Sequence, residues 1–144
     1  CPPGMVQKYL NKISGPLLDR IDLHVEVTPV SFDELASKEK GESSESIRER
    51  VIKSREVQEQ RFEKNDGIHS NAQMSTKQLQ KICHLDEKSQ QMLKMAMEKL
   101  DLSARAYDRI LKVARTIADL ETAENISTEH IAEAIQYRSL DREG

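Results

Sequence analysis

Aromatic residues are scarce in this sequence, at 3% of 144 residues, and tryptophan is absent. Hydrophobic residues reach 37% and charged residues 33%, and no apolar run approaches the roughly 20 residues that span a bilayer as a helix. This composition excludes a membrane-spanning helix and favours a helical bundle with a core of leucine, isoleucine, valine, alanine and methionine. The length is that of one domain or slightly more.

Cysteine is also rare. Cys1 and Cys83 are too few for a disulfide framework. Cys83 precedes His84 but has no second pair at the spacing of a zinc site, so we predict a buried free thiol. The four histidines show no paired spacing, and no role is assigned to them. One cysteine does not hold a metal, so the segment is expected to bind none.

The sequence lacks the features of common nucleic-acid and nucleotide sites. Its formal net charge is −3, which gives no overall basic surface for nucleic acid. It contains no G-x-x-x-x-G-K-[ST] loop, which would cradle phosphates, and no apolar run ending in Asp-Glu, which would hold magnesium. We therefore predict that the chain alone neither binds ATP tightly nor hydrolyses it.

The most informative stretch that is present is S-G-P-L-L-D-R-I-D, at residues 14–22. Its Gly-Pro pair ends the short helical pattern that precedes it. Residues 22–28 then alternate polar and apolar side chains, which is typical of a half-buried strand. Arg20 is thus predicted to lie at the start of a strand, where its side chain points in a fixed direction. An ordinary surface ion pair with Asp19 or Asp22 is the alternative.

Helical patterns fill the rest of the chain, with apolar residues at i, i+3 and i+4 spacing and serine or aspartate before several starts. We predict a capped turn at 31–35, a long charged helix at 46–64, and helices over 75–84, 86–100, 102–120 and 129–137. The side chains expected to face inward are Ile47, Val51, Ser54, Gln58 and Phe62 of the long helix, Met92, Leu93, Ala96 and Leu100 of the next, and Ala106, Ile110, Val113, Ile117 and Leu120 of the helix at 102–120. The last four helices form a compact bundle.

Arg105 is the second cation of interest, because it falls in the first turn of the helix predicted at 102–120. The helix dipole disfavours a cation at this end. Its place there makes sense if the same position receives an anion such as phosphate. A surface pair with Asp101 or Asp108 is the alternative. Arg109 and Arg115, on the same helix, are weaker candidates.

Two stretches resemble one protein family. S-G-P-L-L-D-R-I-D-L-H-V-E-V, at residues 14–27, is similar to the end of the ATPase core in the magnesium-chelatase-like AAA+ family, in its bacterial ComM/YifB (competence protein) branch. L-S-A-R-A-Y-D-R-I-L-K-V-A-R-T-I-A-D-L, at residues 102–120, is similar to the sensor-2 helix of that family. The chain is thereby identified as a C-terminal fragment, in agreement with a Cys-Pro-Pro-Gly start that is neither a signal peptide nor an initiator.

The resemblance implies a mainly α fold in three parts. Residues 1–30 would be the end of an AAA+ core, with a short helix and one strand. Residues 31–71 would be a linker and a long helix before sensor 2, and residues 72–144 a C-terminal four-helix lid. Arg20 would be an arginine finger acting in trans on a neighbour's nucleotide, and Arg105 would be the sensor-2 arginine that binds nucleotide.

The implied activity is ATP hydrolysis by a head-to-tail ring of copies of the longer protein, a hexamer in this family, with ATP and Mg²⁺ held outside this segment. For the ComM branch it implies DNA translocation or branch migration during recombination of incoming DNA, in the cytoplasm. Cys1 follows a cysteine-rich insertion in the family and would be the last ligand of a metal cluster. A magnesium-chelatase subunit and a non-enzymatic helical interaction module are the alternatives.

Overall fold

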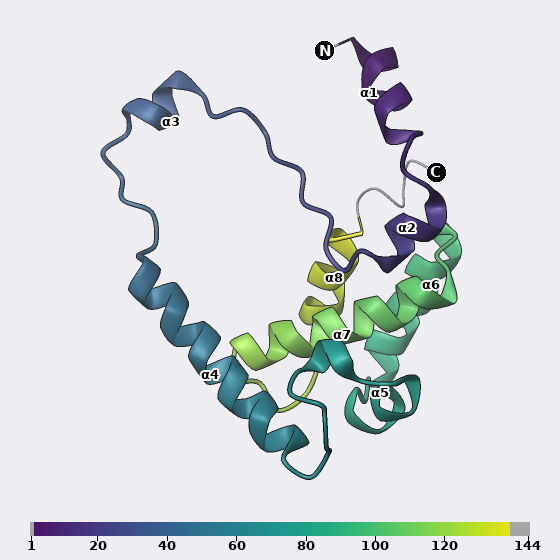
Figure 1. The fold of residues 1–144 in the computed structure, drawn as a ribbon. Coiled ribbons are helices and arrows are strands. Elements are labelled where there is room, and N and C mark those ends of the chain that lie inside the picture. Colours follow the sequence, from purple (N-terminus) through teal and green to yellow (C-terminus); the bar gives the residue numbers. More distant parts are fainter. Residues whose placement is uncertain (1, 139–144) are drawn as a thin grey trace.

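The structure, a computed structural model, describes residues 2–138 and is built from helices joined by loops (Figure 1). In chain order the elements are α1 (Pro3–Leu10), α2 (Gly15–Arg20), α3 (Phe32–Ala36), α4 (Ser44–Phe62), the 3₁₀ turn η1 (Asn71–Gln73), α5 (Thr76–Ile82), α6 (Glu87–Leu100), α7 (Ala104–Leu120) and α8 (Thr128–Gln136). Over residues 2–138 there is no strand, and no helix is long and apolar enough to cross a bilayer. The predicted mainly α fold is confirmed.

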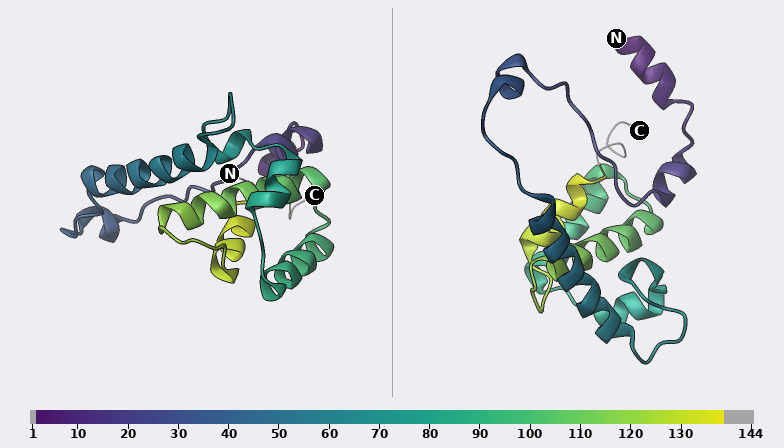
Figure 2. Two further views of the ribbon diagram at one scale, coloured as in Figure 1. Left: turned by 90° about the horizontal axis from the view of Figure 1, so that it is seen from below. Right: turned by 60° about the vertical axis from the view of Figure 1, so that its left-hand side comes forward.

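Helix α7 is the centre of the bundle. Helices α2, α4, α5 and α8 and the turn η1 all pack against it, and α6 packs against α8. Figure 2 shows α4 on one side of α7 and α8 on the other. The apolar stripe of α7 places Ala106, Ile110 and Ala114 out of contact with solvent. The inward face that the sequence predicts for this helix is therefore confirmed at Ala106, Ile110 and Ile117, whereas Val113 and Leu120 are only half-buried.

The helix starts follow from local sequence. Each helix from α2 to α8 is preceded by a serine or aspartate whose side chain accepts a hydrogen bond from the backbone N–H three residues later, which satisfies a donor that the helix itself leaves unpaired. These capping residues are Ser14, Ser31, Ser43, Ser75, Asp86, Ser103 and Ser127. The long helix begins two residues earlier than predicted, because Ser43 caps it.

The strand predicted at residues 22–28 does not form. The backbone from residue 21 to residue 31 contains no helix and no strand, and Val25 and Val27 are 69% and 87% exposed. A strand needs a neighbouring strand to pair its N–H and C=O groups, and residues 2–138 supply none. The alternating pattern therefore gives an exposed segment that runs into the wide loop around α3 in Figure 1.

Two predicted inward faces reach the core only in part. The line along α4 is buried at Ser54, Gln58 and Phe62, but Ile47 and Val51 are 44% and 41% exposed. Figure 1 shows the start of α4 projecting away from the bundle, so its first turns have no packing partner in the described chain. On α6, Leu93 and not Met92 faces the core, and Met92 is 36% exposed.

Candidate functional site

Arg20 is the last residue of α2, a helix that Ser14 caps and that ends where the backbone becomes extended at the next residue. Its side chain is exposed, and within residues 2–138 it makes neither a hydrogen bond nor an ion pair. In this described part of the chain, neither Asp19 nor Asp22, the alternative partners, forms an ion pair with it. Asp22 instead forms an ion pair with Arg109, with 3.0 Å between Oδ1 and Nη1. The guanidinium of Arg20 is therefore available to a ligand or another molecule.

Arg105 is the second residue of α7, after the cap Ser103. Its side chain is exposed and, like that of Arg20, has no hydrogen bond or ion pair in the described chain. Asp108 instead accepts a hydrogen bond from the Thr76 hydroxyl at 3.0 Å, and Asp101 ends α6 in a left-handed conformation (φ 49°). A guanidinium beside the unpaired N–H groups of a helix start favours binding of an anion over binding of a cation.

The elements that carry these two arginines lie in contact, because α2 packs on α7. Arg109 follows Arg105 by four residues on α7, so the two lie on the same face of the helix. Its ion pair with Asp22 joins this face to the residues that follow Arg20. No hydrogen bond or ion pair joins Arg20 to Arg105 directly within residues 2–138.

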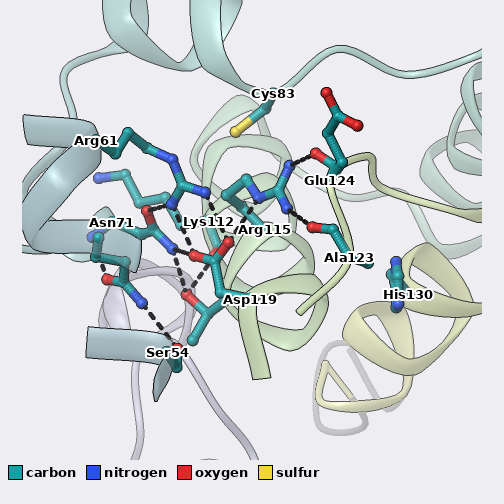
Figure 3. Close-up of polar contacts among 12 residues, drawn as sticks. Ser54, Arg61, Asn71, Cys83, Lys112, Arg115, Asp119, Ala123, Glu124 and His130 are labelled. Atoms are coloured by element: carbon teal, nitrogen blue, oxygen red, sulfur yellow. Dashed lines mark hydrogen bonds and ion pairs between the residues drawn. The ribbon is translucent and has the colours of Figure 1, made fainter. Parts of the chain in front are cut away.

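A buried polar cluster lies elsewhere on α7, around Asp119 (Figure 3). Both oxygens of its fully buried carboxylate accept hydrogen bonds from Arg61 of α4, each at 2.7 Å. Arg115 donates from Nε to the same carboxylate at 3.2 Å, and Asn71 of η1 donates at 2.8 Å. Two guanidinium groups and one carboxylate are thus held away from water with good hydrogen-bond geometry, which is the condition under which buried charge is tolerated.

Arg115 is buried, and its other two guanidinium nitrogens donate to the carbonyls of Ala123 at 2.7 Å and Glu124 at 3.0 Å. These bonds fix the loop between α7 and α8. Arg115 therefore acts inside the fold and not at a site. Sequence reasoning missed Arg61, Asn71 and Asp119. The available signal was an Arg-Asp pair, four residues apart, next to the apolar stripe of α7.

Cys83 is a buried free thiol, as predicted, with its Sγ 3.9 Å from the carbonyl oxygen of Leu111. Burial raises the pKa of Cys83 to about 11, so the thiol stays protonated and unreactive near neutral pH. It lines a cavity of about 780 Å³ between α5, α6 and α7, together with Tyr107 and Asp108. Nothing in the chemistry of these lining residues indicates a reaction.

No metal site is evident in the part of the chain that the structure describes, where no three histidine, cysteine or acidic side chains converge. The prediction for Cys1 falls outside the described residues. Among the histidines, to which no role was assigned, His130 is buried and its Nε2 lies 2.7 Å from a carboxylate oxygen of Glu121. Its Nδ1 accepts from the backbone N–H of Ser127 at 2.9 Å, so it caps α8.

Comparison with known sequences gives two family matches in order along the chain. Residues 1–35 match the model of magnesium chelatase, subunit ChlI, and residues 41–138 match the model of its C-terminal region. The boundary between the two matches falls in the loop between α3 and α4. Arg20 lies in the first matched segment, and Arg105 lies in the second.

Individual relatives agree with these matches. The chain is 43% identical to competence protein ComM of Haemophilus influenzae over 97% of its length, and 43% identical to the uncharacterised protein YifB of Salmonella typhimurium over 99%. It is 33% identical to an uncharacterised protein of Mycobacterium tuberculosis over 96%. It spans 27% of the length of each of these relatives. Because the C-terminal model covers more than half of the chain, this protein belongs to the family of the magnesium chelatase subunit ChlI C-terminal region.

Proposed function

We propose that this chain is the C-terminal part of a ring-forming AAA+ ATPase and that it supplies two arginines to ATP hydrolysis. The supporting observation is that the two family segments follow each other on one chain and that each carries an exposed arginine whose side chain has no hydrogen-bond or ion-pair partner among residues 2–138. An exposed arginine alone is weak support, because Arg48 and Arg55 of α4 are also unpaired in the described residues. The resemblance of the stretches around Arg20 and Arg105 to the end of the ATPase core and to the sensor-2 helix of the family adds the specificity.

In this proposal Arg20 is an arginine finger. During hydrolysis, negative charge builds on the oxygens of the transferred phosphoryl group, and an inserted guanidinium that stabilises it raises the rate by about 10³- to 10⁵-fold in other nucleotide hydrolases. Arg20 acts on the nucleotide of a neighbouring subunit, which requires a closed head-to-tail ring, a hexamer. The phosphate-binding loop and the Mg²⁺ ligands come from outside this segment.

Arg105 is the proposed sensor-2 arginine. At the start of α7, its fork of N–H donors and the free backbone N–H groups of the helix can bind phosphate oxygens together. These interactions exist with bound ATP as well as in the transition state, so they contribute to nucleotide binding and to turnover.

We further propose that the ring acts on DNA in the cytoplasm, by translocation or branch migration during recombination. The name of the Haemophilus influenzae relative, a competence protein, supports this use. With a net charge of −3, this segment would leave most of the DNA contacts to the rest of the protein. The match to magnesium chelatase models favours a second candidate, an ATPase that drives a metal-insertion partner. Stimulation of ATP hydrolysis by DNA, compared with stimulation by a porphyrin-bound partner, distinguishes the two.

The test of the proposal uses the longer protein that contains this segment. Arg20→Ala should abolish hydrolysis but leave ATP binding nearly unchanged, and Arg20→Lys should restore little because it lacks the planar fork. Arg105→Ala should weaken both binding and turnover. Arg55→Ala, which removes another exposed and unpaired arginine, is the matched control and should change neither. An Arg20→Ala protein that hydrolyses ATP at the unmutated rate would refute the proposal.

A further inference from the structure

The residues on either side of Arg20 contact the residues that directly follow α8, the last helix of the described chain. Arg138, at 1% exposure, donates hydrogen bonds from its guanidinium to the backbone carbonyls of Leu18, at 3.1 Å, and Ile21. Leu18 lies in the last turn of α2, where its carbonyl also accepts a hydrogen bond from the backbone N–H of Ile21 at 3.1 Å, and Ile21 is the residue that ends the helix. A buried guanidinium that binds these two carbonyls fixes both the end of α2 and the backbone that carries Arg20.

A second contact reaches the same segment from α7. The guanidinium of Arg109 lies 3.0 Å from the carboxylate of Asp22, two residues after Arg20. The side chains are 29% and 46% exposed, so the ion pair contributes little to stability but restricts where the segment can lie. Arg109 is one helical turn after Arg105, so the segment with the proposed finger is joined to the helix with the proposed sensor.

His24 makes the third contact. Its backbone N–H donates to the carbonyl of Tyr137 at 2.7 Å. Its imidazole ring is buried, and the Nε2 atom of the ring lies 3.3 Å from the carbonyl oxygen of Leu18. His24 is the one buried residue among residues 2–43, the part of the chain that precedes α4. The segment from Leu18 to His24 is therefore held at both ends and in the middle, while residues on either side of it are largely exposed.

We propose that Arg109 and Arg138 are positioning residues for Arg20, which means that the lid of each subunit sets the direction of the finger that this subunit offers to its neighbour. The proposal rests on the proposed function of Arg20. Because the side chain of Arg20 makes no hydrogen bond or ion pair within residues 2–138, its direction depends on the backbone that these contacts hold. A misplacement of about 1 Å can reduce catalysis by about 10²-fold.

The experiment measures ATP hydrolysis by the longer protein carrying Arg109→Ala. The variant should lower kcat by about 10- to 100-fold, through loss of orientation, and change the KM for ATP less than about threefold. Arg50→Ala is the matched control, because it removes another exposed ion pair, the one between Arg50 of α4 and Glu42, which precedes that helix, and it should leave kcat unchanged. The double variant Asp22→Arg/Arg109→Asp restores the pair in reverse and should recover most of kcat.

Hydrogen exchange on the same variants separates undocking from unfolding. In Arg109→Ala, the amide of His24 should exchange faster while the amides of α8 keep their protection. Arg138→Lys keeps the charge but loses the fork that binds two carbonyls, and should give the same pattern of exchange and the same fall in kcat. Unchanged exchange at His24 in both variants would overturn the proposal.

The kinetic outcomes also distinguish this inference from the proposed function. If Arg20→Ala abolishes hydrolysis and Arg109→Ala leaves kcat unchanged, the proposed role of Arg20 as an arginine finger is supported and the positioning role of Arg109 is refuted. If Arg109→Ala lowers kcat but the reversed pair does not restore it, or if KM rises in step, Arg109 does not act through Asp22. If Arg20→Ala has no effect, the proposed function itself fails.

Discussion

The N-terminal arm, residues 2–43, and the bundle around α7 use the same local chemistry with different results. Both contain serine-capped helices, and both contain apolar residues at regular spacing. In the bundle these apolar residues meet other helices and are buried. In the arm they are exposed, as at Tyr9 with 68%, Val27 with 87% and Phe32 with 81%. The comparison teaches that local sequence sets the conformation of a segment, whereas burial requires a partner surface.

The two regions should differ most in how much the loss of one aspartate lowers the free energy of unfolding. Asp119→Ala removes the buried carboxylate that two arginines share, so it should lower the free energy of unfolding by about 3–5 kcal/mol, because an uncompensated buried charge remains. Asp33→Ala in the exposed helix α3 should change it by less than about 0.5 kcal/mol. Urea unfolding followed by circular dichroism measures both. Equal effects would show that the cluster does not stabilise the bundle.

Shortening an apolar side chain should also change the free energy of unfolding much more in the bundle than in the N-terminal arm. Ile110 is fully buried, and Ile110→Ala should cost about 2–5 kcal/mol because it leaves a cavity. Val27→Ala removes an apolar side chain that is 87% exposed and should cost less than about 0.5 kcal/mol. The same unfolding measurement applies. A cost at Val27 as large as that at Ile110 would mean that the arm is packed in solution.

The bundle should also lose stability at high pH through Cys83. Burial raises the pKa of this thiol to about 11. The folded state keeps the proton while the unfolded state releases it above its lower pKa, so the stabilising effect is complete below about pH 9 and is lost as pH rises towards 11. The expected loss is about 2–3 kcal/mol under reducing conditions. Cys83→Ala should show a shallower decline over the same pH range, and identical slopes would contradict the assignment.

The smallest expected difference in unfolding free energy is between variants of two helix capping boxes that have the same geometry. Ser75 caps α5 in the bundle and Ser31 caps α3 in the arm, and each has its side chain and backbone paired with the residue three positions later. Ser75→Ala should lower the free energy of unfolding by about 1 kcal/mol. Ser31→Ala should leave global stability unchanged, because α3 contributes no buried residue. A measurable global cost at Ser31 would indicate that α3 unfolds together with the bundle.

Much of the fold is predictable from sequence because helix caps and apolar periodicity are local. Ser31, Ser75 and Ser103 mark helix starts, and the stripe of α7 gives its buried face. The exposed start of α4 and the absent strand at residues 22–28 are different. They depend on whether a partner surface exists, which a local pattern does not encode.

The candidate site also has features that local sequence predicts and features that it does not. The positions of Arg20 at a helix end and Arg105 at a helix start follow from the Gly-Pro pair and from the cap at Ser103. The roles of Arg109 and Arg138 were not predictable, because their partners lie 87 residues or more away in the chain. The Arg61–Asp119 pair, 58 residues apart, was missed for the same reason.

The central claim, that Arg20 acts on the nucleotide of a neighbouring subunit, is tested most directly by mixing two inactive variants of the longer protein. One variant carries Arg20→Ala, and the other lacks the lysine of its phosphate-binding loop. In mixed rings some interfaces pair an intact arginine with an intact loop, so the account predicts that part of the ATP hydrolysis returns, with the largest recovery near equal proportions. If every mixture is as inactive as the separate variants, although mixed rings form, Arg20 does not act across the interface.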